Sequence, residues 1–294
     1  MTVALSIVEY NTKDLLRDCL KTIFSQKWQN QVKVWVVDNA SKDDSVLMVK
    51  KEFPEVRLIE SKKNLGFGAG HNLVFKKANS DYFLILNSDT KMGAGAIDGM
   101  AAFLEENPDC AIASCKILGF DGYLQPNGGD LPIGLALFNW LFNLELFGSI
   151  KASFHRNDKS YYQNAHKVGW VSGNFMMVKR EVFKKIGFFN EDYFMYFEDV
   201  EFCYRAKKAG FEVWVNPNVN ILHLSGGSQD DPKLRQWLGE FRGLVLFYRQ
   251  NFGILASYFI KILVYLAIMV RIITFALMGR LNYAKTYAKV IFTL

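Results

Sequence analysis

Short apolar runs alternate with amphipathic segments along the first 90 residues, and this alternation constrains the fold more than any other feature. The segments between the runs place apolar side chains at helical spacing, as in residues 15–24. Strands that are separated by helices pair in parallel, so the pattern predicts a doubly wound α/β sheet with helices on its faces. The expected strands span residues 3–8, 32–37, 56–59 and 82–86.

Polar residues gather at the predicted carboxyl ends of these strands. Asp38 ends the second strand and Asp89 follows the fourth. A glycine-rich segment, residues 64–70, follows the third strand. Because ligands of doubly wound sheets bind at the carboxyl ends of the strands, the sequence predicts a ligand site at this edge.

The glycine-rich segment opens a predicted helix. Its glycines, Gly66, Gly68 and Gly70, are spaced G-x-G-x-G, whereas a dinucleotide fingerprint is spaced G-x-G-x-x-G and follows the first strand. This spacing disfavours an NAD-dependent oxidoreductase. Glycines there would let the backbone approach a ligand, and the helix start beyond favours anionic groups. A tight turn that binds nothing is the alternative.

Asp89 is a candidate ligand for a divalent metal. A carboxylate beside a hydroxyl, here that of Thr90, can hold Mg²⁺ or Mn²⁺ with help from substrate phosphates. His223 could supply a second ligand, or it could be a satisfied core residue of its short strand. The turn that follows it, residues 225–228, could offer hydroxyl and N–H groups to a diphosphate.

Asp38 is a candidate for recognising a nucleobase. Its carboxylate could accept the N3–H of uracil or thymine, and Tyr10 could supply a stacking face. A turn-capping Asp and a core Tyr are the alternatives.

Two adjacent carboxylates, Glu198 and Asp199, stand at the start of another predicted helix. Residues 193–197 before them are all aromatic or apolar, which favours partial desolvation and a raised basicity. A basic carboxylate suits a general base. The alternative is that Asp199 is a helix N-cap, or simply an acid that favours the positive end of the helix.

The net charge of +6 is unevenly distributed. Residues 233–294 contain nine Lys or Arg and a single acid, Glu240, so this segment carries +8 and the first 232 residues carry −2. A slightly acidic globular part argues against nucleic-acid binding, and a basic tail favours an anionic surface. The four cysteines form no C-x-x-C pair, and we expect reduced, buried thiols in a cytosolic protein without a secretory signal.

The basic tail is also apolar. Residues 254–278 are long enough to cross a bilayer, but Lys261 and Arg271 interrupt them. We expect a helix that lies in the membrane interface, with its basic residues toward the headgroups. A spanning helix and packing within an oligomer or against a domain are the alternatives. A second apolar stretch, residues 131–150, could be a core helix or a membrane-facing flap. The basic residues are Lys261, Arg271, Arg280, Lys285 and Lys289.

Seven short segments, taken in order, resemble the family 2 glycosyltransferases of GT-A fold, and their rhamnosyltransferase-like branch in particular. They read SIVEYN, VVDNAS, NLGFGAGHN, LNSD, SGNFMM, YFED and HLSGGS. The resemblance covers residues 2–228, and the ordered set is much more specific than any one segment. It implies a catalytic domain over residues 1–232 and a basic, apolar helical region over residues 233–294.

The resemblance also implies roles for individual residues. Asp89 would bind the metal, Mg²⁺ or Mn²⁺, and His223 would complete the metal or diphosphate site. Asp199 would be the catalytic base, with Glu198 beside it to tune it or to contact the acceptor. The donor nucleotide would bind at Tyr10, Asn11, Asp38, Asn64, Gly66 and Ser88, and the sugar or acceptor would meet Trp170, Ser172 and Gly173.

The implied activity is inverting transfer of a sugar from a nucleotide-diphosphate donor, dTDP-rhamnose or a UDP-sugar, to a glycan or polyprenyl-linked acceptor. We expect the protein at the inner face of the cell membrane, and a homo-oligomer is one of the assemblies that its apolar segments allow. A sugar-nucleotide-binding protein without transferase activity and a nucleotidyltransferase are the alternatives.

The sequence departs from the family pattern at two positions. Asn87 replaces the first acid of the DxD-type motif, which leaves the metal with fewer anionic ligands. Glu9 stands at a strand end where the family more often has a small residue, and a buried carboxylate there requires a partner.

Overall fold

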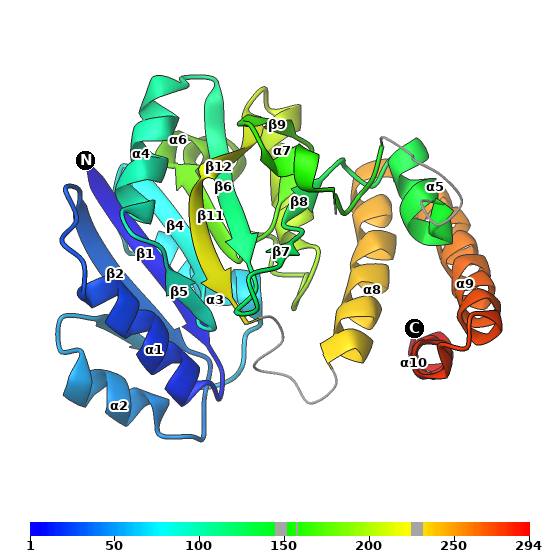
Figure 1. Cartoon of the computed structure of the whole chain (residues 1–294), viewed down its shortest axis with the longest axis horizontal. Coiled ribbons are helices and arrows are strands. Elements are labelled where there is room, and N and C mark those ends of the chain that lie inside the picture. The colour runs from blue at the N-terminus through cyan, green and yellow to red at the C-terminus, as the bar shows by residue number, and fades with distance from the viewer. Residues whose placement is uncertain (145–151, 157, 225–231) are drawn as a thin grey trace.

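The computed structural model describes residues 1–144, 152–156, 158–224 and 232–294. Figure 1 shows a central twisted sheet with helices on both faces, and beside it a separate group of helices built mainly from residues 232–294. The strands are β1 (Thr2–Glu9), β2 (Gln31–Asp38), β3 (Arg57–Glu60), β4 (Tyr82–Asn87), β5 (Thr90–Met92), β6 (Cys110–Leu118), β7 (Leu124–Gln125), β8 (Gly128–Gly129), β9 (His166–Val168), β10 (Trp170–Val171), β11 (Phe175–Lys179) and β12 (Glu212–His223). The helices are α1 (Lys13–Phe24), α2 (Ser45–Glu52), α3 (Phe67–Phe75), α4 (Ala96–Glu106), α5 (Leu135–Phe142), the 3₁₀ helix η2 (Lys159–Tyr162), α6 (Arg180–Ile186), α7 (Glu198–Lys208), α8 (Pro232–Phe252), α9 (Ile254–Leu277) and α10 (Leu281–Thr293).

The sheet confirms the predicted parallel half and adds an antiparallel strand. Its order is β3-β2-β1-β4-β11-β6-β12-β5, and β1, β2, β3 and β4 pair in parallel as the alternation predicts. β11 lies antiparallel between β4 and β6, whereas β12 runs parallel to β6. The carboxyl ends of β1, β2 and β4 therefore meet at one edge.

Hydrophobic side chains fill both faces of this sheet. On one face α1, α2 and α4 bury apolar residues such as Leu16, Val49 and Leu104. On the other face α3, α6 and α7 contribute Phe75, Phe183 and Phe202 to a core rich in aromatic rings. All four cysteines are buried and none forms a disulfide.

The apolar tail forms a helical layer rather than a single appendage. α8 packs against α9 and α10, and α5 packs against α9, so the described part of the second apolar stretch lies against the tail (Figure 1). Residues 145–150 of that stretch lie outside the described residues. α9 is long and apolar enough to cross a membrane. Only 28% of its most apolar window is buried in the protein, so α9 is not a typical buried core helix.

Our expectation that Arg271 faces lipid headgroups is wrong. Its side chain lies inside the helical layer and is 5% exposed. The guanidinium donates hydrogen bonds to the carbonyl oxygens of Leu141, at 2.9 Å, and of Trp140, and to the hydroxyl of Tyr287 at 2.5 Å. The last carbonyls of a helix lack partners within the helix, so a charged donor from α9 satisfies the end of α5.

Candidate active site

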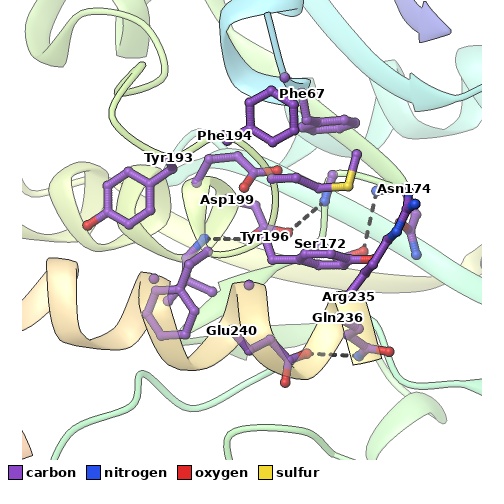
Figure 2. A pocket seen from close by; sticks show the side chains of 18 of the residues that line it. Phe67, Ser172, Asn174, Tyr193, Phe194, Tyr196, Asp199, Arg235, Gln236 and Glu240 are labelled. Atoms are coloured by element: carbon purple, nitrogen blue, oxygen red, sulfur yellow. Dashed lines mark hydrogen bonds between the residues drawn. The ribbon is translucent and has the colours of Figure 1, made fainter. Parts of the chain in front are cut away.

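A cleft of about 1100 Å³ opens at the carboxyl ends of the strands. The strand ends and the loop before α7 form part of its lining, and α8 closes the other side (Figure 2). Most of the residues predicted for the site line this one cleft, although they are spread over more than 200 positions of the chain. They are Tyr10, Asn64, Gly66, Ser88, Asp89, Trp170, Ser172, Gly173, Glu198, Asp199 and His223.

Asn11 and Asp38 lie next to the cleft and organise its loops. The Asp38 carboxylate accepts hydrogen bonds from the backbone N–H of Ala40 at 3.1 Å and of Ser41 at 3.3 Å. The side-chain oxygen of Asn11 accepts one from the N–H of Lys42 at 2.8 Å. These contacts hold the β1 and β2 ends together, and recognition of a base by Asp38 stays a prediction.

Glu9 finds the partners that its burial requires. Its carboxyl accepts a hydrogen bond from the hydroxyl of Ser41 at 2.6 Å and from the N–H and hydroxyl of Thr12 at 3.2 Å. Burial and the neighbouring Asp38 raise the pKa of Glu9 to about 7. The Thr12 hydroxyl also lies 3.0 Å from that of Ser88, so hydrogen bonds through Glu9 and Thr12 connect Ser41, after β2, to the segment that carries Asp89.

The glycine-rich segment packs closely against the chain itself. A Cβ on Gly66, whose φ is +86°, would lie 2.1 Å from the carbonyl oxygen of Phe194, and one on Gly70 would lie 2.9 Å from Val8. The backbone N–H of Phe67 donates to the same Phe194 oxygen at 2.8 Å. These contacts supply a structural reason for the glycines, and their contact with a donor stays a prediction.

Sheet pairing brings Asp89 and His223 together. His223 pairs with Thr90 across the β5–β12 ladder, which places its ring beside the preceding Asp89. The His223 Nε2 lies 3.2 Å from the Asp89 Oδ1, and both side chains are buried. No group of three His, Cys, Asp or Glu side chains suited to a metal occurs among the residues that the structure describes. One carboxylate and one imidazole suit an ion that takes its other ligands from water and phosphates.

Gln125, which the sequence analysis missed, orients this histidine. Its Nε2 donates to the His223 carbonyl oxygen at 2.9 Å, so its Oε1, 2.8 Å from His223 Nδ1, accepts a hydrogen bond from the Nδ1–H of the ring. Nδ1 therefore carries a hydrogen, and Nε2 is the ring nitrogen that faces Asp89. Asn87 Nδ2 lies 3.2 Å from this Nε2, from the adjoining strand end. A hydrogen bond from the other ring nitrogen commonly orients a histidine that binds a metal.

Glu198 and Asp199 begin α7, and the N-cap position is Phe197, so the N-cap alternative for Asp199 is wrong. The Asp199 carboxylate accepts hydrogen bonds from the N–H of Gly173 at 3.1 Å and of Val200 at 2.8 Å. Burial raises the pKa of Asp199 to about 6. Glu198 is 4% exposed, and burial together with the charge of Asp199 raises its pKa well above the usual range.

Trp170, Ser172 and Gly173 form the wall beside Asp199. The indole of Trp170 stacks on Phe154, and its N–H donates to the Phe154 carbonyl at 3.0 Å. A Cβ on Gly173 would lie 2.7 Å from the ring of Phe67, so the glycine lets that ring close the cleft next to the carboxylate. Figure 2 shows Phe67, Ser172 and Asp199 around the same opening.

The side of the cleft that α8 supplies was not predicted. Arg235, Gln236 and Glu240 of α8 line the cleft together with Asp199, and Figure 2 shows Arg235 extending from α8 toward Ser172. Gln236 donates to the Glu240 carboxylate at 2.8 Å, and His155 lies 3.6 Å from the same carboxylate. One signal was available, because Glu240 is the single acid of residues 233–294.

Comparison with known proteins identifies the class that this fold and cleft define. The family model described as glycosyl transferase family 2 matches residues 6–187. The chain therefore belongs to glycosyl transferase family 2.

Several of its relatives and structural neighbours are named as glycosyltransferases. It is similar to N-acetylglucosaminyl-diphospho-decaprenol L-rhamnosyltransferase of Mycobacterium tuberculosis, with 27% identity over 213 residues that make up 66% of this chain and 67% of that protein. It is also similar to the low-salt glycan biosynthesis hexosyltransferase Agl10 of Haloferax volcanii, with 27% identity over 74% of this chain and 66% of that one. Among solved structures, the mannosyltransferase PcManGT of Pyrobaculum calidifontis, in complex with GDP-Man and Mn²⁺, aligns with 98% of this chain and 73% of its own at a TM-score of 0.57 and 17% identity. The predicted GT-A-like fold is thus confirmed.

Proposed function

We propose that the protein transfers a sugar from a nucleotide-diphosphate donor to a hydroxyl of a glycan or polyprenyl-linked acceptor, with inversion at the anomeric carbon. The donor is dTDP-rhamnose or a UDP-sugar. The rhamnosyltransferase relative, whose name includes a lipid diphosphate, supports this choice of donor and acceptor classes.

The observation that carries the proposal is that Asp199 lines the same cleft as the Asp89–His223 pair. Asp89 and His223 would hold Mg²⁺ or Mn²⁺, which when bound neutralises charge on the departing diphosphate. Asp199, charged at neutral pH yet more basic than an ordinary aspartate, takes the proton from the acceptor hydroxyl. A single displacement with the base opposite the leaving group inverts the sugar.

Glu198 has a separate role in this scheme. Burial and the neighbouring charge of Asp199 raise its pKa well above the usual range, which favours the protonated form of this carboxyl over a second buried negative charge. A protonated carboxyl can donate a hydrogen bond into the cleft, which suits contact with the acceptor.

A screen of ligands by thermal shift separates the candidate functions. The full chain is heated with UDP-, dTDP- and GDP-sugars, ATP and NAD, each with and without Mn²⁺. If the protein is a transferase, a pyrimidine nucleotide-sugar should stabilise it, and this stabilisation should require Mn²⁺. In a second assay with lipid-linked acceptors, the protein should release the nucleoside diphosphate. Stabilisation by a nucleotide-sugar without any release would favour a binding protein, and stabilisation by ATP alone would favour a nucleotidyltransferase.

The tail supports a location at the inner face of the cell membrane. α9 exposes a large apolar face, on which five side chains are 58–85% exposed: Leu255, Phe259, Ile262, Ile273 and Leu277. Residues 254–294 contain no acid and carry Arg280, Lys285 and Lys289 at exposed positions. An apolar face next to exposed positive charge suits anionic lipid, and anchoring there would raise the effective acceptor concentration.

Flotation with vesicles tests this location. The Phe259→Glu/Ile262→Glu variant places two charges on the apolar face, and we expect it to lose most binding to vesicles that contain phosphatidylglycerol. Leu47→Glu, at an equally exposed position on α2, is the matched control and should float like the wild type. Unchanged flotation of the α9 variant would refute membrane contact through this face. The face would instead belong to an oligomer interface if the wild type did not bind vesicles and formed an oligomer that the same two substitutions dissociate into monomers.

A further inference from the structure

The turn that presents Asp199 has a strained backbone. Tyr196 and Phe197, directly before Glu198, have φ angles of +69° and +76°. Large aromatic residues rarely adopt the left-handed region, and each such residue costs on the order of 1 kcal/mol or more. The surrounding structure must therefore hold this turn in place.

The turn packs closely against two glycines of α8. A Cβ on Gly239 would lie 2.5 Å from Cδ2 of Tyr196, and a Cβ on Gly243 would lie 2.4 Å from Cβ of Phe197. The glycines are four residues apart, so they lie on one face of the helix. Each glycine costs a helix about 1 kcal/mol relative to alanine, so close packing of the turn is the physical reason for both.

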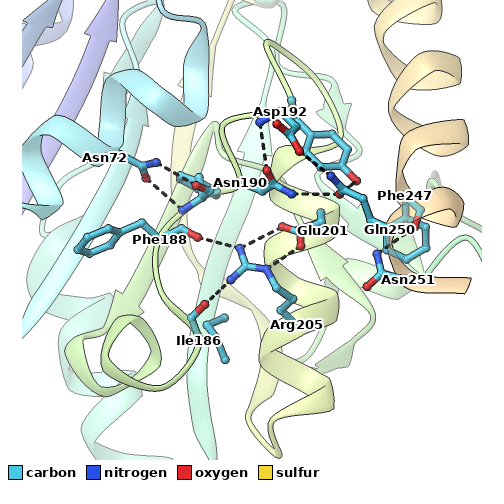
Figure 3. Close-up of polar contacts among 12 residues, drawn as sticks. Asn72, Ile186, Phe188, Asn190, Asp192, Glu201, Arg205, Phe247, Gln250 and Asn251 are labelled. Atoms are coloured by element: carbon cyan, nitrogen blue, oxygen red, sulfur yellow. Dashed lines mark hydrogen bonds and ion pairs between the residues drawn. The ribbon is translucent and has the colours of Figure 1, made fainter. Parts of the chain in front are cut away.

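A second contact fixes the start of the same loop to the far end of α8. Gln250 accepts hydrogen bonds from Asn190 at 3.0 Å and from the hydroxyl of Tyr193 at 3.1 Å, and it donates one to Asp192 at 2.7 Å (Figure 3). The loop of residues 190–197 is therefore held by α8 at both of its ends.

We propose that Gly239 and Gly243 are positioning residues for sugar transfer: they hold the left-handed turn of Tyr196 and Phe197 so that Asp199 meets the acceptor hydroxyl. This inference rests on the proposed role of Asp199 as the base. It makes α8 part of the catalytic unit, although the sequence places this helix in the basic tail.

The Gly239→Ala and Gly243→Ala variants test the proposal, with nucleoside diphosphate release as the assay. We expect kcat to fall ~10-fold or more while the KM for the donor changes less than threefold, because the nearest atoms that a Cβ on either glycine would meet belong to residues 195–197 and not to the predicted donor residues. The acid limb of the pH–rate profile should move to higher pH, since a displaced Asp199 loses the hydrogen bond from Gly173. Gly99→Ala, in α4, is the matched control, because its Cβ would meet only Val219, at 3.3 Å.

A double-mutant cycle separates positioning from a general loss of stability. Tyr196→Gly removes the ring that an alanine at 239 would strike and keeps the left-handed turn accessible. In that background Gly239→Ala should lower kcat less than threefold. An equal loss of kcat in both backgrounds, or a wild-type kcat in Gly239→Ala and Gly243→Ala, would overturn the proposal while leaving the transferase activity of the wild type intact. A wild type that releases no nucleoside diphosphate would overturn the proposed function itself.

Discussion

The backbone N–H of Gly173 donates a hydrogen bond to the carboxylate of Asp199 at 3.1 Å. This bond connects the segment before β11 to the first turn of α7, two parts of the chain that are 26 residues apart. Burial raises the pKa of Asp199, and this hydrogen bond lowers it, so the pKa settles at about 6. The carboxylate is therefore charged at neutral pH and still a better base than an exposed aspartate.

The rate of transfer should depend on the protonation of Asp199. Because the base works only when it is deprotonated, kcat/KM should fall about tenfold for each pH unit below about 6. Initial rates at saturating Mn²⁺ between pH 4.5 and 8 measure this limb. A profile that stays flat down to pH 4.5 would contradict the assignment.

The same raised pKa means that the charged Asp199 lowers the stability of the folded state at neutral pH. Between the ordinary pKa of an aspartate and about 6, the native state binds more protons than the unfolded state, so stability is lost as the pH rises through this window. Asp199→Asn removes the charge, and we expect it to be more stable than the wild type by about 1–3 kcal/mol at pH 7.5. The advantage should shrink toward pH 4, as measured by urea unfolding at both pH values, and an advantage that is largest at pH 4 would have the wrong sign.

Gln125 should control metal affinity without touching the metal. Gln125→Leu removes the acceptor for His223 Nδ1–H, and we expect affinity for Mn²⁺ to fall ~10-fold, as for other residues that orient a ligand. Asp89→Ala should abolish Mn²⁺-dependent nucleotide binding. Calorimetry with Mn²⁺ and UDP or dTDP measures both, and wild-type affinity in Asp89→Ala would exclude the metal site.

Arg271 should matter for folding rather than for membrane binding. Arg271→Met leaves the carbonyl oxygens of Trp140 and Leu141 without their charged donor, so we expect a loss of about 2–4 kcal/mol of stability. Lys261→Met, on the same helix at a partly exposed position, is the control and should change stability by less than about 0.5 kcal/mol. Equal unfolding free energies for both variants would show that the buried guanidinium is not structural.

The parallel half of the sheet was predictable because its strands follow one another with helices between them, so local patterns determine the pairing. The antiparallel β11 was not predictable, since its partners β4 and β6 are distant in sequence. Asp89 and His223 could each be nominated from their neighbours, but their contact depends on the β5–β12 ladder.

The position of Arg271 was misjudged for a related reason. Charge and hydropathy describe which surfaces suit lipid, but they do not reveal that α5, from the first half of the chain, packs on α9 and supplies free carbonyls to a guanidinium. The role of Gly239 and Gly243 likewise depends on a turn more than 40 residues earlier. Contacts of this kind become visible only in three dimensions.

The most direct test of the central claim is the single-turnover rate of Asp199→Asn beside its affinity for the donor. If Asp199 is the base, Asp199→Asn should transfer sugar ~100-fold or more slowly than the wild type, as measured by release of UDP or dTDP from the nucleotide-sugar. The Kd of the variant for the donor with Mn²⁺ should stay within threefold of the wild-type value. A variant that transfers sugar at the wild-type rate would contradict the account.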